Sequence, residues 1–131
     1  MQIELYSLEA EEAVIGSLLV DPDTILFVQE IISPDDFYLQ RLGVIYQAII
    51  ELHGKGIPHD IVTLSDELSR QKKLDFAGGA AYLTELINST PTASRAPHYA
   101  KIIKRSSVQR QLKDAAGEVA KIAHNNEIDS E

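Results

Sequence analysis

The chain has 131 residues, which is room for one domain of ordinary size or for one domain with an appendage. It carries 12 basic and 20 acidic side chains and no cysteine, which excludes a disulfide framework, a thiolate nucleophile and a cysteine zinc site. Apolar residues make up 44% of it, as in folded proteins, and no run of 18 apolar residues predicts a membrane span. The first residues also lack the basic and apolar blocks of a signal peptide, so we expect a soluble cytoplasmic protein.

The charge is unevenly distributed. Residues 1–90 hold 5 basic and 15 acidic side chains, whereas residues 91–131 hold 7 basic and 5 acidic ones. The acidic part is excluded as a general DNA-binding surface, because phosphate neutralisation needs clustered Lys and Arg. The segment from Arg95 to Lys113 has six basic residues and no acidic one, but aromatic residues are almost absent from it. A solvated helix face is therefore favoured there over a nucleic-acid interface.

Apolar residues recur at helical spacing almost throughout, which predicts an all-α fold. Ser7 is a good N-cap for the first helix, and three acidic residues follow it where the helix dipole favours them: Glu9, Glu11 and Glu12. Asp21-Pro22 predicts the start of a second helix that runs to about Ile32. Residues 33–36 repeat this start signal in a short turn. We interpret the acidic pairs beside Pro22 and Pro34 as helix-start residues and not as catalytic carboxylates.

Three further helices are predicted in the middle of the chain. One carries Leu42 to Leu52 and stops at the glycines and proline of residues 54–58. Asp60 caps the next, which continues to about Lys72. Gly78-Gly79 forms the turn before a fifth helix that holds Tyr82, Leu83, Leu86 and Ile87.

The last helix is expected from about Ser94 to about His124 and changes its apolar face along its length. Its first turns place Tyr99, Ile102, Ile103 and Ser106 on one side. Its later turns place a second set on nearly the opposite side: Val108, Leu112, Ala115, Val119, Ile122 and Ala123. We expect the first set to pack on the preceding helices. The second set has coiled-coil-like spacing and needs a second hairpin arm or another subunit.

No motif for catalysis is found. The chain has no Gly-x-x-x-x-Gly-Lys-Ser/Thr loop for nucleotide phosphates and no arguable Ser-His-Asp grouping. Four histidines are present, but none pairs with another at helical spacing, so we expect no metal site. They are expected on the surface or at helix caps: His53, His59, His98 and His124. A small enzyme is the least favoured function.

Several segments, in order, resemble the N-terminal region of replicative DNA helicases of the DnaB family. The resemblance begins in the first predicted helix and the turn after it. The segments there are Ser-Leu-Glu-Ala-Glu at 7–11, Ala-Val-Ile-Gly-Ser-Leu-Leu at 13–19 and Asp-Pro at 21–22. It continues at residues 34–38, 45–49, 56–64, 78–83, 90–93 and 99–103. Each segment is a weak signal alone, but together they cover nearly the whole chain and are specific.

The resemblance implies a domain without the motor. In that family, a small helical globule is followed by a long helical hairpin, hairpins of neighbouring subunits pair, and six such domains form a collar as a trimer of dimers. The collar also binds the helicase-interacting domain of primase. The resemblance thus implies a non-enzymatic fragment with no cofactor of its own, since ATP, magnesium and contact with DNA belong to the complete ring and its motor. We expect that the chain ends near the hairpin tip.

Two subdomains are therefore predicted, a globule over 1–93 and the first arm of the hairpin over 94–131. For self-association we choose five residues on the second face of the last helix: Leu112, Ala116, Val119, Ile122 and Ala123. The alternative is that this face packs internally. For primase contact the candidate is Tyr82, with a core tyrosine as the alternative. A different function, a separate helical adaptor such as a helicase-binding domain of a primase or a loader, is also open.

Overall fold

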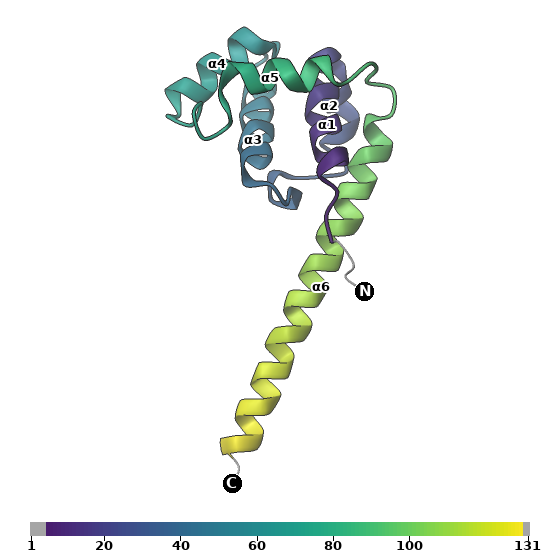
Figure 1. Ribbon diagram of the computed structural model, residues 1–131, viewed down its shortest axis with the longest axis vertical. Coiled ribbons are helices and arrows are strands. Elements are labelled where there is room, and N and C mark those ends of the chain that lie inside the picture. The colour runs from purple at the N-terminus through teal and green to yellow at the C-terminus, as the bar shows by residue number, and fades with distance from the viewer. Residues whose placement is uncertain (1–4, 130–131) are drawn as a thin grey trace.

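The computed structural model describes residues 5–129, with side chains placed up to residue 126. Every regular element in this range is helical, which confirms the all-α prediction: α1 Leu8–Val20, η1 Pro22–Thr24, α2 Ile25–Val28, η2 Pro34–Asp36, α3 Gln40–Gly54, α4 Ile61–Arg70, α5 Gly79–Asn88 and α6 Ala96–Asp129. The two η elements are short 3₁₀ turns. Helices α1–α5 form a globule, and α6 passes along it and then projects far beyond it (Figure 1). No described helix is long and apolar enough to cross a bilayer.

The predicted caps and turns are confirmed where the signal is local. Ser7 Oγ accepts a hydrogen bond from the Ala10 amide at 3.2 Å, and Asp60 Oδ1 accepts one from the Thr63 amide at 2.8 Å. Each bond satisfies an amide that has no partner within its helix. Gly56 has φ 71°, a left-handed conformation that glycine adopts without steric cost, just after α3 ends.

The second predicted helix is wrong in its extent. The segment begins as a 3₁₀ turn at Pro22, and α2 ends at Val28 instead of continuing to about Ile32. Ile32 is buried, and its carbonyl accepts a 2.9 Å hydrogen bond from the Tyr46 hydroxyl. The chain therefore leaves the helix because the core takes up Ile32 and α3 supplies a hydrogen bond to its backbone.

Two other boundaries differ from the prediction. Helix α4 ends at Arg70, and Lys72 adopts φ 60°, which places it in the left-handed region that ends helices. Helix α6 begins at Ala96 rather than near Ser94 and continues to Asp129, beyond the predicted end near His124.

The core lies between α1, α3, α4, α5 and the first turns of α6. Its largest fully buried side chains come from these elements and from α2: Tyr46, Ile15, Leu18, Ile25, Leu42, Ile45, Ile49, Leu64, Leu68, Leu83, Leu86 and Ile103. At Gly16, α1 lies directly against the end of α5. A Cβ atom there would collide with Thr90 Oγ1 and lie 2.6 Å from the Leu86 carbonyl oxygen. Only glycine permits this close approach.

The first turns of α6 belong to the globule. Ile103 and Ser106 are buried, and Tyr99 and Ile102 are half-buried. The first predicted face of the last helix is thus confirmed as a packing face.

Asp36 connects the loop before α3 to α6 through hydrogen bonds and an ion pair. Its Oδ2 accepts a 2.8 Å hydrogen bond from the Ser33 amide, and its Oδ1 accepts one from the Ser107 hydroxyl at 2.7 Å. Lys104 Nζ lies 3.4 Å from Oδ2. Burial alone would raise the pKa of Asp36, but these three partners outweigh it and hold the pKa below its usual value. The interpretation of this residue as a helix-start acid is therefore incomplete, because it also joins two distant segments.

We expect Asp36→Ala to lower the free energy of unfolding by about 3 kcal/mol, because the Ser107 hydroxyl and the Ser33 amide lose their acceptor. Asp36→Asn keeps the shape and removes the charge, so its loss should be smaller. Since the folded-state pKa is depressed, the stability that the carboxylate contributes is present above about pH 4 and is lost as the pH falls through the folded-state pKa. Urea titrations of both variants at pH 7 and at acidic pH measure this. A gap between Asp36→Asn and the unaltered chain that persists at the lowest pH would contradict the assignment.

Candidate protein-interaction surfaces

The distal part of α6 has a bare apolar face. Every side chain from Gln111 to Asn126 is exposed, a length of about 24 Å at 1.5 Å per residue. Leu112 and Val119 are each 65% exposed and Ile122 is 58% exposed. Ala116 and Ala123 of the same helix are also exposed. The alternative that these five residues pack internally does not hold among the described residues, but their role in self-association stays a prediction.

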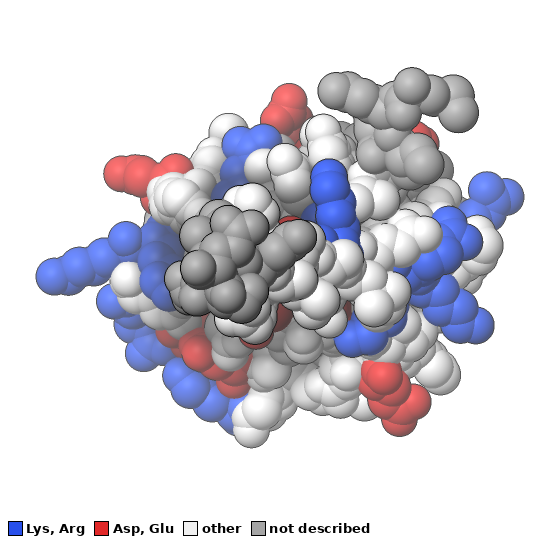
Figure 2. All heavy atoms as spheres, turned by 90° about the horizontal axis from the view of Figure 1, so that it is seen from below, with Lys and Arg blue, Asp and Glu red and all other residues white. Residues whose placement is uncertain are grey.

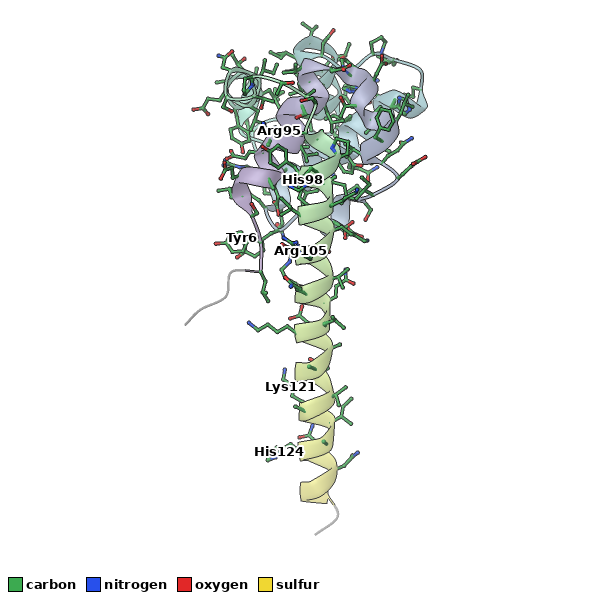
Figure 3. All side chains as sticks on the ribbon, turned by 90° about the vertical axis from the view of Figure 1, so that its right-hand side faces the viewer. Tyr6, Arg95, His98, Arg105, Lys121 and His124 are labelled. Carbon is green, nitrogen blue, oxygen red and sulfur yellow. The ribbon has the colours of Figure 1, made fainter. Side chains whose placement is uncertain are left out.

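Arg110 makes the last hydrogen bonds between α6 and the globule among the described residues. Its Nη1 donates to the Leu5 carbonyl at 2.6 Å, and its Nη2 donates to the Asp36 carbonyl at 2.8 Å. The guanidinium also lies 5.5 Å from the centre of the Tyr38 ring, which stacks on Tyr6 at 3.9 Å. Figure 3 shows Tyr6 beside α6 near Arg105, and Lys121 and His124 farther out on the bare helix. Arg110 thus marks where the globule ends and the arm begins.

Glu11 is a residue whose position the sequence interpretation missed. It is buried, and its two carboxylate oxygens accept the amides of Tyr38 and Leu39 at 2.8 and 3.0 Å, just before α3. Burial raises the pKa of Glu11, although the two amides and Arg110 favour its charged form. The signal was its spacing, because Glu11 falls on the same helical stripe as Val14 and Leu18.

Tyr82 lies at the centre of a polar cluster between α1, α3 and α5. Its side chain is only 9% exposed, and its hydroxyl donates a 2.7 Å hydrogen bond to Glu12 Oε2. The Arg41 guanidinium stacks on the ring at 4.2 Å from its centre. Burial raises the pKa of Tyr82, and the carboxylate of Glu12 raises it further, so the hydroxyl stays protonated and donates. The ring is thus part of the core, with Glu12 at its hydroxyl and Arg41 over its face, and a contact with primase stays a prediction.

We expect Tyr82→Phe to lower the free energy of unfolding by about 1 kcal/mol, because one hydrogen bond to a half-buried carboxylate is lost while the ring keeps its packing. The matched control is Tyr99→Phe, since the Tyr99 hydroxyl bonds to no other described residue, and it should change stability little. Chemical denaturation of the three proteins compares them. Equal losses for the two variants would show that the bond to Glu12 contributes nothing.

His59 corrects the expectation that the histidines lie on the surface or at caps. It is 2% exposed, next to the carbonyl of Leu18 at the end of α1. Burial lowers the pKa of its imidazole, so the ring is neutral at pH 7. His98 and His124 are exposed, as expected.

Basic side chains lie on the face of the molecule from which the arm projects (Figure 2). Figure 2 looks up along the arm and shows Lys and Arg side chains protruding on both sides of this face, with a few Asp and Glu among them. Lys101 and Arg105 are exposed, whereas Lys104 and Arg110 are engaged by Asp36. The basic run thus divides into a structural part and a solvated part.

Comparison with known proteins decides the family. The model of the DnaB-like helicase N-terminal domain matches residues 3–105, which is most of the chain. The chain belongs to this family. It is 37% identical over 125 residues to the replicative DNA helicase DnaC of Bacillus subtilis, and this match covers 95% of the chain but 28% of that helicase. The DnaB-family chain therefore spans just over a quarter of the length of this relative.

Solved structures agree with the family assignment. The N-terminal domain of DnaB helicase from Mycobacterium tuberculosis superposes with a TM-score of 0.87 at 39% identity, and the match covers 91% of this chain and 86% of that one. A DnaB-like replicative helicase, whose structure was described with its interactions with primase, superposes with a TM-score of 0.78 at 25% identity. The latter match covers 90% of this chain and 28% of the helicase.

Proposed function

We propose that this chain is a non-catalytic collar domain of a replicative DNA helicase, which pairs with further copies through α6 and docks primase. The observation that carries the proposal is the apolar face of α6 beyond Arg110, whose side chains are all exposed up to Asn126. The family assignment favours this function over a separate helical adaptor, because the similar proteins reported above are themselves replicative helicases. Assembly of six copies into a collar belongs to the same proposal.

Pairing through α6 is supported by the cost of exposing apolar surface to water. Leu112, Val119 and Ile122 each present more than half of their side chain to water. Burying a side chain of this size gains about 1.5–3 kcal/mol. Their spacing of seven and three residues keeps them on one side of the helix, as in coiled-coil seams. A second copy of the same helix offers the same stripe, so one symmetric contact covers both.

Docking of primase is supported by the similar helicase studied with primase. On this chain we place the contact around Tyr82. The ring itself is nearly covered, so Glu12 and Arg41, which it positions, would supply most of the exposed surface. A carboxylate and a guanidinium held in fixed positions are suited to a polar partner surface.

The test of pairing is the mass of the 131-residue chain measured by light scattering across a hundredfold range of concentration. We expect the mass to rise from that of a monomer to that of a dimer or larger assembly. A mass that stays monomeric at the highest concentration would count against pairing through α6.

The test of docking is a titration with the C-terminal domain of a primase from the same source. We expect saturable binding that Arg41→Ala weakens at least tenfold, while circular dichroism shows an unchanged fold. Saturable binding that Arg41→Ala leaves unaffected would move the site away from Tyr82. The absence of any binding would favour the adaptor function instead.

ATP and magnesium are expected to bind only to a motor domain. The 131-residue chain should therefore hydrolyse no ATP, since it has no phosphate loop. Hydrolysis that follows the protein through repurification would overturn this part of the proposal.

A further inference from the structure

A second exposed apolar surface lies on the globule, at α2. This helix has four residues, of which Ile25 and Val28 are buried in the core. The two between them point outward, with Leu26 51% exposed and Phe27 61% exposed. They form a ridge of two large apolar side chains on a rigid, packed element. The ridge belongs to the globule and lies well away from the tip of α6 (Figure 1).

A groove runs along each side of this ridge. The first groove, of about 480 Å³, has Phe27 in its wall together with Val20, Pro91 and Pro97. The second groove, of about 270 Å³, has Leu26 in its wall together with Ile57 and Pro58. Prolines and aliphatic side chains make up part of each wall, and polar side chains such as Thr24, Thr92 and Ser94 complete the first groove. Helices pack together when rows of side chains on one enter the grooves on the other, so a ridge flanked by two grooves is suited to contact with a second helix.

The charge of the grooves is negative. Asp21 lies in the wall of the first groove and Asp23 in the wall of the second, and both are exposed. No Lys or Arg lines either groove. His53 and His59 also line the second groove, and burial lowers the pKa of His59, so that ring adds no positive charge at pH 7. The Nε2 atom of His59 is buried and has no hydrogen-bond partner among the described residues, so this wall contains an unsatisfied polar atom.

We propose that the α2 ridge and its two grooves are a docking surface for a positively charged amphipathic helix of a partner protein. Apolar side chains of that helix would enter the grooves on either side of Leu26 and Phe27. Lys or Arg residues beside its apolar stripe would meet Asp21 and Asp23. This surface is separate from the α6 face and from the Tyr82 cluster, and it does not rest on either role.

The probe is a synthetic 18-residue helix with Leu at positions 4, 7, 8, 11 and 15 and Lys on the flanking positions. A control peptide keeps the leucines and carries Glu in place of Lys. Both are titrated by NMR into isotope-labelled chain carrying Leu112→Asp, which is expected to suppress pairing through α6. We expect the Lys peptide to bind at least tenfold more tightly, with shifts confined to amides near residues 20–28, 56–59 and 91–94.

Matched variants distinguish binding at this site from nonspecific binding. Leu26→Ser combined with Phe27→Ser should weaken binding of the Lys peptide at least tenfold. Val62→Ser, which alters a valine that is 77% exposed on α4 outside both grooves, should leave it unchanged. Equal binding of the two peptides, no binding of either, or shifts centred on another surface would overturn the proposal. Self-association of the unaltered chain is measured separately, so its outcome does not affect this one.

Discussion

A Val119→Asp variant of the 131-residue chain will stay monomeric at concentrations at which the unaltered chain pairs. In the single chain, Val119 is 65% exposed, so aspartate is solvated there and costs the helix only a few tenths of a kcal/mol. In a paired state the carboxylate would be buried in an apolar seam without a partner, which costs at least about 3 kcal/mol. The dissociation constant should therefore rise at least a hundredfold. Light scattering measures the pairing, and circular dichroism should report an unchanged helix content.

Two further variants make the test specific to one face. Leu112→Asp lies on the same stripe and should reproduce the effect. Lys121→Ala alters the other side of the same helix, where its ammonium lies 3.6 Å from Glu118, and should leave pairing intact. Loss of pairing in Lys121→Ala to the same degree, or wholesale loss of the circular dichroism signal in Val119→Asp, would refute the assignment of this face.

Gly16→Ala will destabilise the globule by about 2–3 kcal/mol, although alanine is the better helix former. The added methyl group would meet Thr90 Oγ1 and the backbone carbonyl of Leu86, and the latter cannot rotate away. Helix α1 must then separate from the end of α5, which opens the core beside Ile15 and Leu18. Urea denaturation at pH 7 gives the change in the free energy of unfolding.

Gly117→Ala is the matched control, since it makes the same chemical change in a helix where nothing lies within 4 Å. It should stabilise the helical conformation of the distal part of α6 by about 1 kcal/mol, and the urea concentration at which the globule unfolds should not fall. Similar destabilisation by both alanines would show that helix packing at Gly16 is not the cause.

The sequence predicts most of the fold because most helix boundaries are set by residues close to them in the chain. Ser7, Asp60 and the pair Gly78-Gly79 act through their own backbone neighbours, so their roles are visible without knowledge of the tertiary structure. The extent of α2 is different. It is set by the burial of Ile32 and by the hydroxyl of Tyr46, which is fourteen residues away in the chain. A distant side chain determines where α2 ends, so the local sequence pattern does not predict this boundary.

The same distinction applies to the surfaces. The change of apolar face along α6 follows from spacing alone, and the structure places Leu112 and Val119 in solvent as that spacing indicates. The roles of Glu11 and Asp36 do not follow in this way. Both look like first-turn acids in the sequence, yet Glu11 holds the amides before α3 and Asp36 holds Ser107 of α6. Their partners are up to 71 residues away, so only the folded chain reveals them.

Helix α6 is a single uninterrupted rod of 34 residues that is shared between the packed globule and the projecting arm. A rod of this kind transmits both translation and rotation. If two arms pair, a slip of one residue in their register turns one globule about its arm by about 100° relative to the other and shifts it by about 1.5 Å. In such a pair, the direction in which Tyr82 and the α2 ridge face would be set at the far end of the molecule, by how the two arms pack against each other.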